Sequence, residues 1–220
     1  MSNKHFLALP VTGDTFAEIR EKNRYYVDKT PYLKTVFSED EAVDDKSLIN
    51  GTTVLLLTRP RRFGKTLLMS MFESFLKISA KEPGNITKHL NYFKGTKILE
   101  DKEFCKKYMG QFPVISITLK DVLGDDFESA YLKLAEVVSA KANEFSFLKE
   151  SPYLNEMEKA KFNLLCDEIY LKKADKQAIS YVTSAIKSLS LMLYKHFNKQ
   201  VYVLIDEYDV PLAKAQDNNY

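Results

Sequence analysis

The 220-residue chain has little of several features that mark particular classes of protein. Its two cysteines, Cys105 and Cys166, lie far apart and have no partners at metal-ligand spacing, so we interpret both as reduced structural thiols. Seven glycines and seven prolines are too few for a disordered or repetitive chain. No apolar run approaches the roughly 18 residues of a membrane span, and the N-terminus has no sustained apolar core. We therefore expect no contact with a membrane and a cytoplasmic location.

The chain also lacks an excess of charge of either sign. Its formal net charge is +2, so no overall basic character indicates a nucleic-acid partner, although the loop around Arg61 is locally basic. Hydrophobic residues make up 45% of the chain and charged residues 28%, as in ordinary soluble globular proteins. A chain of 220 residues is long enough for one domain with a sizeable core.

A phosphate-binding loop is the first motif that indicates a function. The apolar run Val54–Leu57 precedes a basic loop and Gly64-Lys65-Thr66, after which apolar residues recur at helical spacing; this predicts strand, loop and helix. In a P-loop, Gly64 lets the backbone approach a phosphate, Lys65 places a positive charge at the β and γ phosphates, and Thr66 ligates Mg²⁺. Arg59 stands where the generic motif has its first glycine. The alternative, a chance tripeptide in a surface turn, is weakened by the predicted flanking strand and helix.

A second motif, Val201–Pro211, lies near the other end of the chain. Its first residues are typical of a strand buried on both faces, and Asp206 and Glu207 follow at the carboxyl end of that strand. Ligands bind at the carboxyl ends of strands in parallel α/β sheets. Asp206 fits the Walker B carboxylate that holds Mg²⁺, and Glu207 fits the base that deprotonates the attacking water. The alternative, a solvated acidic turn, loses weight because one Mg-nucleotide would join this motif to the phosphate loop.

The rest of the chain predicts helices and further strands. Asp14 or Thr15 caps a first helix that runs to Asn23, and Asp28 caps a second helix with Tyr32, Leu33, Val36 and Phe37 on its apolar side. The other predicted elements are a brief strand at Tyr25–Val27, a surface loop at Ser38–Gly51, short helices within Ile86–Tyr108, a strand at Phe112–Leu119, a helix from Phe127, a helix at Leu154–Leu171 and a helix capped by Asp175 that runs to Phe197. This order favours a three-layer α/β arrangement with right-handed crossovers.

Several segments together resemble the AAA-ATPase-like family of bacterial proteins, relatives of the archaeal and STAND-type ATPases within the P-loop superfamily. The segments occur in the family's order and span almost the whole chain. They are Phe16–Arg20, Tyr26–Thr30, Leu57–Thr66, Tyr92–Ile98, Pro113–Lys120 and Leu204–Pro211. The family's own phosphate loop has the form RPRRFGKT, so Arg59 departs from the generic motif but agrees with the family.

The resemblance implies ATP and Mg²⁺ as cofactors and gives each motif a role. The loop residues implied to bind the nucleotide are Arg59, Pro60, Arg61, Arg62, Phe63, Gly64, Lys65, Thr66 and Leu67. Lys65 and Glu207 are the implied catalytic residues, and Thr66 and Asp206 are the implied ligands of Mg²⁺. Arg61 or Arg62 either contacts the γ-phosphate as an internal finger or pairs with Asp209 or Glu207, and both alternatives stay open.

The resemblance also implies that Tyr26, Asp28 and Lys29 border the adenine or the ribose. The alternative is a capped packing helix with a tyrosine anchor, and the two interpretations carry equal weight. On the first interpretation, residues 1–50 border the nucleotide and residues 51–220 form the P-loop core through Walker B, within one domain of residues 1–220.

The implied fold is a three-layer P-loop NTPase of the ASCE or AAA-like type with a mainly parallel sheet. In that branch, the strand between the Walker A and Walker B strands follows Walker B in sequence, so we expect the sheet to be incomplete at the C-terminus, as in a fragment. Its two neighbours would then lie about 10 Å apart with unpaired backbone groups. We expect the chain alone to fold poorly unless another chain supplies a strand, and a cooperative thermal melt of its monomer would contradict that expectation. We expect these residues alone to bind nucleotide weakly and to hydrolyse it inefficiently, and full ATPase activity only in a longer form.

The resemblance predicts an Mg-dependent ATPase module whose hydrolysis cycle switches the conformation of an attached effector. One alternative is a nucleotide-sensing or protein-binding module without turnover. Another is an accessory ATPase of a DNA nuclease, because family members often carry a PD-(D/E)XK-type nuclease domain; nucleic acid would then be bound only through a domain outside these residues. A protein partner or self-association is compatible with each of these.

Overall fold

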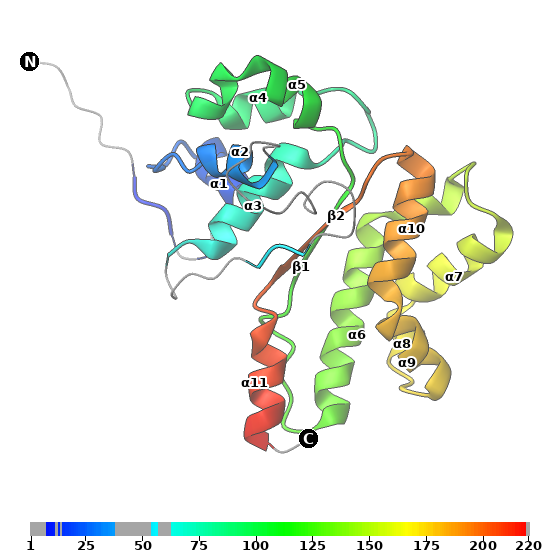
Figure 1. Cartoon of the computed structure of the whole chain (residues 1–220). Coiled ribbons are helices and arrows are strands. Elements are labelled where there is room, and N and C mark those ends of the chain that lie inside the picture. Colours follow the sequence, from blue (N-terminus) through cyan, green and yellow to red (C-terminus); the bar gives the residue numbers. More distant parts are fainter. Residues whose placement is uncertain (1–7, 12, 14, 38–53, 57–62, 219–220) are drawn as a thin grey trace, which may run out of the picture. The chain divides into compact units, whose positions relative to one another are not determined.

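The computed structural model describes residues 8–11, 13, 15–37, 54–56 and 63–218 (Figure 1). The chain divides into two compact units, and each is described by itself. Unit 1 comprises Met1–Phe75 and Asn85–Gly110, and unit 2 comprises Leu76–Gly84 and Gln111–Tyr220.

The described part of unit 1 is helical and is built around the first turns of α3 (Lys65–Leu76). Its other helices are α1 (Phe16–Glu21), α2 (Pro31–Phe37), α4 (Thr87–Phe93), the 3₁₀ helix η2 (Lys97–Glu100) and α5 (Lys102–Tyr108). The rings of Phe16, Phe75 and Phe93 are fully buried. The Phe93 ring centroid lies 4.7 Å from that of Phe16 and 5.2 Å from that of Phe75. This aromatic cluster joins α1, α3 and α4.

The first helix begins where its capping residues predict. Thr15 forms a capping box with Glu18, so the predicted cap is confirmed at Thr15, whereas Asp14 lies outside the described residues. α1 ends before the predicted Asn23, whose backbone is in the left-handed region with φ of 48°. The apolar side predicted for the second helix is confirmed at Leu33, which is fully buried in α2, but was wrong at Tyr32, whose side chain is 45% exposed.

Two predicted strands of unit 1 are not strands in its described residues. Neither Tyr25–Val27 nor Val54–Leu56 forms a ladder with any described segment, and Val54 is 86% exposed. Leu57, the last residue of the second predicted strand, and the predicted loop Ser38–Gly51 lie outside the described residues. A strand exists only through hydrogen bonds to a neighbour, so apolar sequence alone does not produce one.

Unit 2 contains the two strands that the sequence predicts most strongly. β1 (Val114–Thr118) and β2 (Tyr202–Asp206) pair in parallel, with Val114 opposite Tyr202 and Thr118 opposite Asp206. The predicted strands at Phe112–Leu119 and in the Walker B segment are therefore confirmed. The described residues form a mixed helix and strand fold with a short parallel sheet, which is consistent with an α/β fold. The larger three-layer sheet stays a prediction.

The helices of unit 2 are shorter than predicted, because capping residues divide them. They are α6 (Phe127–Glu144), the 3₁₀ helix η3 (Ser146–Glu150), α7 (Glu156–Cys166), α8 (Glu168–Leu171), α9 (Lys176–Thr183), α10 (Ala185–Phe197) and α11 (Asp209–Asn218). Asp167 ends α7 and caps α8, so the predicted helix Leu154–Leu171 is two helices. Asp175 caps α9 as predicted, but Ser184 separates α9 from α10.

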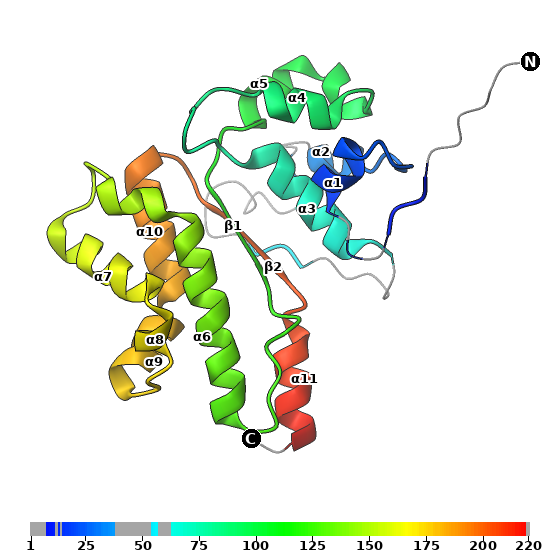
Figure 2. The same ribbon diagram turned by 180° about the vertical axis from the view of Figure 1, so that it is seen from behind.

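The core of unit 2 joins β1 to the helices that follow it. In both views α6 to α10 lie on the same side of the two strands (Figures 1 and 2). The buried residues of this core are Ile115, Ile117, Tyr131, Ala135, Val138, Ala142, Phe145, Leu148, Leu154, Phe162, Leu165, Leu171, Val182, Ala185, Leu189, Met192 and Leu193. On β2, by contrast, one face is partly open to solvent among the described residues, because Val203 is 37% and Ile205 39% exposed. The prediction that this strand is buried on both faces was therefore wrong for the described residues.

The cysteines behave as the sequence suggests. Cys105 lies in α5 and Cys166 in α7, both are free thiols, and burial raises the pKa of each above its ordinary value. In the described part of the chain, the helices are all too short or too polar to cross a lipid bilayer.

Candidate functional site

The described part of the phosphate loop is its last residues before α3. Gly64 has φ of +76°, a left-handed conformation that glycine adopts without strain. Lys65 and Thr66 follow as the first residues of the 12-residue helix α3. The predicted nucleotide-binding residues Arg59, Pro60, Arg61 and Arg62 lie outside the described residues. The described geometry therefore combines a left-handed glycine with the amide groups of a helix start, which is the backbone arrangement that binds anions.

Lys29 lies beside this loop. Its Nζ donates a hydrogen bond to the carbonyl oxygen of Phe63 at 3.1 Å. A Cβ atom added to Gly64 would lie 3.0 Å from the same Nζ. Among Tyr26, Asp28 and Lys29, Lys29 is therefore the one whose side chain contacts the loop in the described residues.

Asp28 has a different environment, because both of its carboxylate oxygens are used within unit 1. Oδ1 accepts hydrogen bonds from the amide of Thr30 at 2.9 Å and from its hydroxyl at 2.7 Å. Oδ2 accepts from the amide of Lys97 at 2.8 Å, and the buried Thr30 hydroxyl in turn accepts from the amide of Ile98 at 3.2 Å. This network ties residues 28–30 to the first turn of η2. It favours the structural interpretation of Asp28 over contact with adenine or ribose.

The pKa of Asp28 reflects this network. Burial by itself raises the pKa, but the hydrogen bonds from the Lys97 amide and from the Thr30 hydroxyl and amide outweigh it. The net result is a pKa below the ordinary value for an aspartate. The folded chain therefore stabilises the charged form of Asp28.

Tyr26 is the tyrosine anchor of the alternative interpretation. Its hydroxyl accepts a hydrogen bond from the Lys29 amide at 3.1 Å and donates one to Met71 Sδ at 3.3 Å. Its ring meets Phe16 edge to face, with centroids 5.1 Å apart. Burial is the main cause that raises the pKa of Tyr26 to about 12. The side chain thus packs against α1 and α3.

The acidic motif lies at the carboxyl end of β2, as predicted. Asp206 is 9% exposed, and its Oδ1 accepts a hydrogen bond from the Glu207 amide at 3.1 Å. Glu207 has φ of +54°, which costs a residue with a Cβ atom about 1–2 kcal/mol. Backbone strain of this kind is concentrated at functional sites. The motif is followed directly by α11, which begins at Asp209.

The two halves of the predicted site belong to different units. Lys65 and Thr66 belong to unit 1, whereas Asp206 and Glu207 belong to unit 2, so their meeting at one nucleotide stays a prediction. Within the described ranges, no group of three or more His, Cys, Asp or Glu side chains could hold a metal ion.

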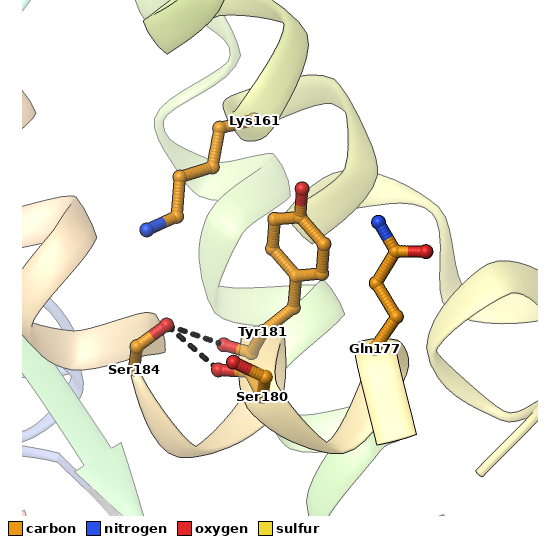
Figure 3. A pocket seen from close by; sticks show the side chains of 5 residues that line it. All are labelled: Lys161, Gln177, Ser180, Tyr181 and Ser184. Atoms are coloured by element: carbon orange, nitrogen blue, oxygen red, sulfur yellow. Dashed lines mark hydrogen bonds between the residues drawn. The ribbon is translucent and has the colours of Figure 1, made fainter. Parts of the chain in front are cut away.

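A polar pocket of about 340 Å³ lies elsewhere in unit 2. It is lined by Lys161, Gln177, Ser180, Tyr181 and Ser184 (Figure 3). The Ser184 hydroxyl bonds to the carbonyl oxygen of Ser180 at 2.8 Å, so it is already partnered. A second depression, of about 500 Å³, lies in unit 1 between Lys34 and Glu103. Neither depression contains a predicted site residue.

The sequence reasoning missed residues that shape the described site. Thr30 and Lys97 complete the network of Asp28, and Ser70 of α3 accepts a hydrogen bond from the Phe16 amide at 2.9 Å. Arg20 donates to the carbonyl oxygens of Tyr92 and Lys94. Most of these residues lie in the segments that carry the family resemblance, which was the available signal.

Comparisons with known proteins agree with this resemblance. A family model described as predicted AAA-ATPase matches residues 10–220. Neither a curated protein nor a solved structure matches the chain.

Replacing Asp28 by alanine tests the structural interpretation of that residue. The variant leaves the Thr30 and Lys97 amides and the Thr30 hydroxyl without their acceptor, so we expect unit 1 to lose about 2 kcal/mol of stability. Urea unfolding followed by circular dichroism measures the loss. Asp121→Ala, at an exposed aspartate, is the matched control and should change stability by less than about 0.5 kcal/mol.

The difference between the wild type and Asp28→Ala should also depend on pH. Because the folded pKa of Asp28 lies below the unfolded value of about 3.9, the stabilisation is complete above that value and disappears as the pH falls through the folded pKa. An equal stability of the two proteins at neutral pH, or a difference that grows on acidification, contradicts this account.

Proposed function

Because the chain belongs to the predicted AAA-ATPase family, we propose that it binds ATP with Mg²⁺ and hydrolyses it. Family membership implies nucleotide binding; hydrolysis, and a conformational switch of an attached effector driven by it, are the proposal. The observation that carries it is the left-handed Gly64 followed by Lys65 and Thr66 at the start of α3. A backbone of this form with a lysine and a hydroxyl at the helix start is suited to a nucleotide's phosphates.

The proposed roles follow from the chemistry of each side chain. Lys65 and the amide groups of the loop neutralise the charge of the β and γ phosphates. Thr66 and Asp206 would hold Mg²⁺, which when bound would lower the negative charge of the phosphates. Glu207 accepts a proton from the attacking water. Positioning and charge stabilisation supply nearly all of the rate enhancement in such transfers.

The strained backbone of Glu207 supports its role as the base. A glutamate in the left-handed region is held there by its surroundings, namely β2 on one side and α11 on the other. The side chain therefore leaves the end of the strand in a defined direction. Such a preset direction is useful for a group that must orient one water molecule.

Replacing Lys65 by alanine should abolish the binding of Mg-ATP. The change removes the positive charge at the phosphates but leaves a good helix former at the start of α3, so the fold should persist. Isothermal titration calorimetry measures the affinity, with circular dichroism as a check of folding. Lys81→Ala, at an exposed lysine, is the control and should bind as the wild type does. An unchanged affinity of Lys65→Ala refutes the assignment of the phosphate loop.

Replacing Glu207 by glutamine separates an ATPase from a sensor that only binds. The amide keeps the size of the side chain but is not a base, so we expect phosphate release to fall at least about 100-fold with little change in ATP affinity. Phosphate release and nucleotide binding are measured on the same preparations. Glu150→Gln, at an exposed glutamate, is the control. A wild type that binds ATP and releases no phosphate favours the sensing module instead.

A further inference from the structure

The ammonium group of Lys29 contacts the backbone of the phosphate loop at Phe63. We propose that Lys29 is a positioning residue of this loop, which acts by fixing the direction of the Phe63–Gly64 peptide group and not by contacting base, ribose or γ-phosphate. The proposal rests on the proposed function and deepens it. It is carried by the 3.1 Å hydrogen bond from Lys29 Nζ to the Phe63 carbonyl oxygen.

The main chain of Lys29 is held on both sides. Its amide donates to the Tyr26 hydroxyl at 3.1 Å, and its carbonyl oxygen accepts from the Tyr32 amide at 3.1 Å. The preceding Asp28 is fixed by its bonds to Thr30 and to η2. The side chain of Lys29 therefore extends from a rigid base, so that reaching Phe63 costs mainly the freedom of its own stem.

The charge of Lys29 is not neutralised by a carboxylate in the described part of the chain. The ion pairs formed by the described residues of unit 1 use other lysines, such as Lys34 with Asp101 at 2.7 Å. The Phe63 carbonyl oxygen is the polar partner that the structure provides for Lys29. Among the described residues, this cation bonds to a neutral carbonyl and to no carboxylate, so its charge favours an anion beside the loop.

The geometry of the peptide group turns this contact into control of an amide. In a trans peptide the C=O and N–H groups point in opposite directions. When Lys29 holds the Phe63 carbonyl, the amide of Gly64 must therefore point away from Lys29. Gly64 is in the left-handed region with φ of +76°, so its amide and the following ones belong to a concave set of donors. By holding the Phe63 carbonyl oxygen, Lys29 keeps this oxygen away from the set of donors and leaves the Gly64 amide within it.

The space around Gly64 supports the same conclusion. A Cβ atom at this position would lie 3.0 Å from Lys29 Nζ and 4.0 Å from Leu67 Cβ. The left-handed backbone favours glycine here, and the ammonium group of Lys29 lies close beside it.

Three ligands distinguish the ways in which Lys29 can act. Mg-ATP contains base, ribose and γ-phosphate, Mg-ADP lacks the γ-phosphate, and Mg-tripolyphosphate lacks base and ribose. The affinity of each for the wild-type chain, Lys29→Met and Lys29→Arg is measured by isothermal titration calorimetry. Methionine keeps most of the stem without the charge or the donors, and arginine restores both.

We expect Lys29→Met to weaken all three ligands by a similar factor of about tenfold, because each needs the loop amides. Lys29→Arg should recover most of this loss, which a purely structural role of the stem would not explain. Lys81→Met is the control and should leave all three affinities unchanged. The Gly64 amide resonance should also shift in Lys29→Met more than in Lys29→Arg, which reports the direction of the peptide group.

Each of the other outcomes overturns the proposal. A loss for ATP and tripolyphosphate but not for ADP indicates direct contact with the γ-phosphate. A loss for ATP and ADP but not for tripolyphosphate indicates contact with base or ribose, and unchanged affinities show that the contact has no role in binding. If Lys29→Met does not fold, Lys29→Gln decides the same comparison. A wild type that binds none of the three ligands refutes the proposed function itself.

Discussion

The carboxylate of Asp28 is the constraint on which the described part of unit 1 most depends. It gathers two amides and a hydroxyl from segments that are 69 positions apart in the chain, and hydrogen bonds to a charged acceptor are stronger than neutral ones. Beside it in the chain, the Tyr26 hydroxyl bonds to Met71 of α3 and the Lys29 ammonium group bonds to the phosphate loop. If Lys29 positions the loop as proposed, Asp28 contributes to nucleotide binding through the residue beside it.

The chemistry proposed for this chain is divided between its two units. The groups suited to phosphates surround the start of α3 in unit 1, and the groups suited to Mg²⁺ and water follow β2 in unit 2. On the proposed function, a nucleotide that contacted both sets would stabilise the arrangement in which both are correctly placed, and its hydrolysis would remove part of that stabilisation. The strained backbone of Glu207 fits the same proposal, because it sets the direction in which the Glu207 side chain leaves the strand, at a cost in local stability.

Local patterns predicted the local structure well. Gly64, the helix after it, the strand at 114–118 and the capping role of Asp175 follow from short-range rules of backbone and capping chemistry. Features that depend on distant partners were not predictable. Val54–Leu56 has strand-like residues but no described partner, and the contact from Asp28 to Lys97 leaves no local pattern. The contact of Lys29 with Phe63 was not predictable for the same reason, since the sequence shows the motif but not the direction of its side chain.

The central claim is that Thr66 and Asp206 hold one divalent ion on one bound nucleotide. Crystals grown with a non-hydrolysable ATP analogue and Mn²⁺ in place of Mg²⁺ test it most directly, because anomalous scattering locates the ion independently of the protein. The account predicts a single Mn²⁺ peak on the phosphates, with the Thr66 hydroxyl bound to it and Asp206 bound directly or through water. A nucleotide bound away from Lys65, or an ion that lacks either Thr66 or Asp206, would contradict it.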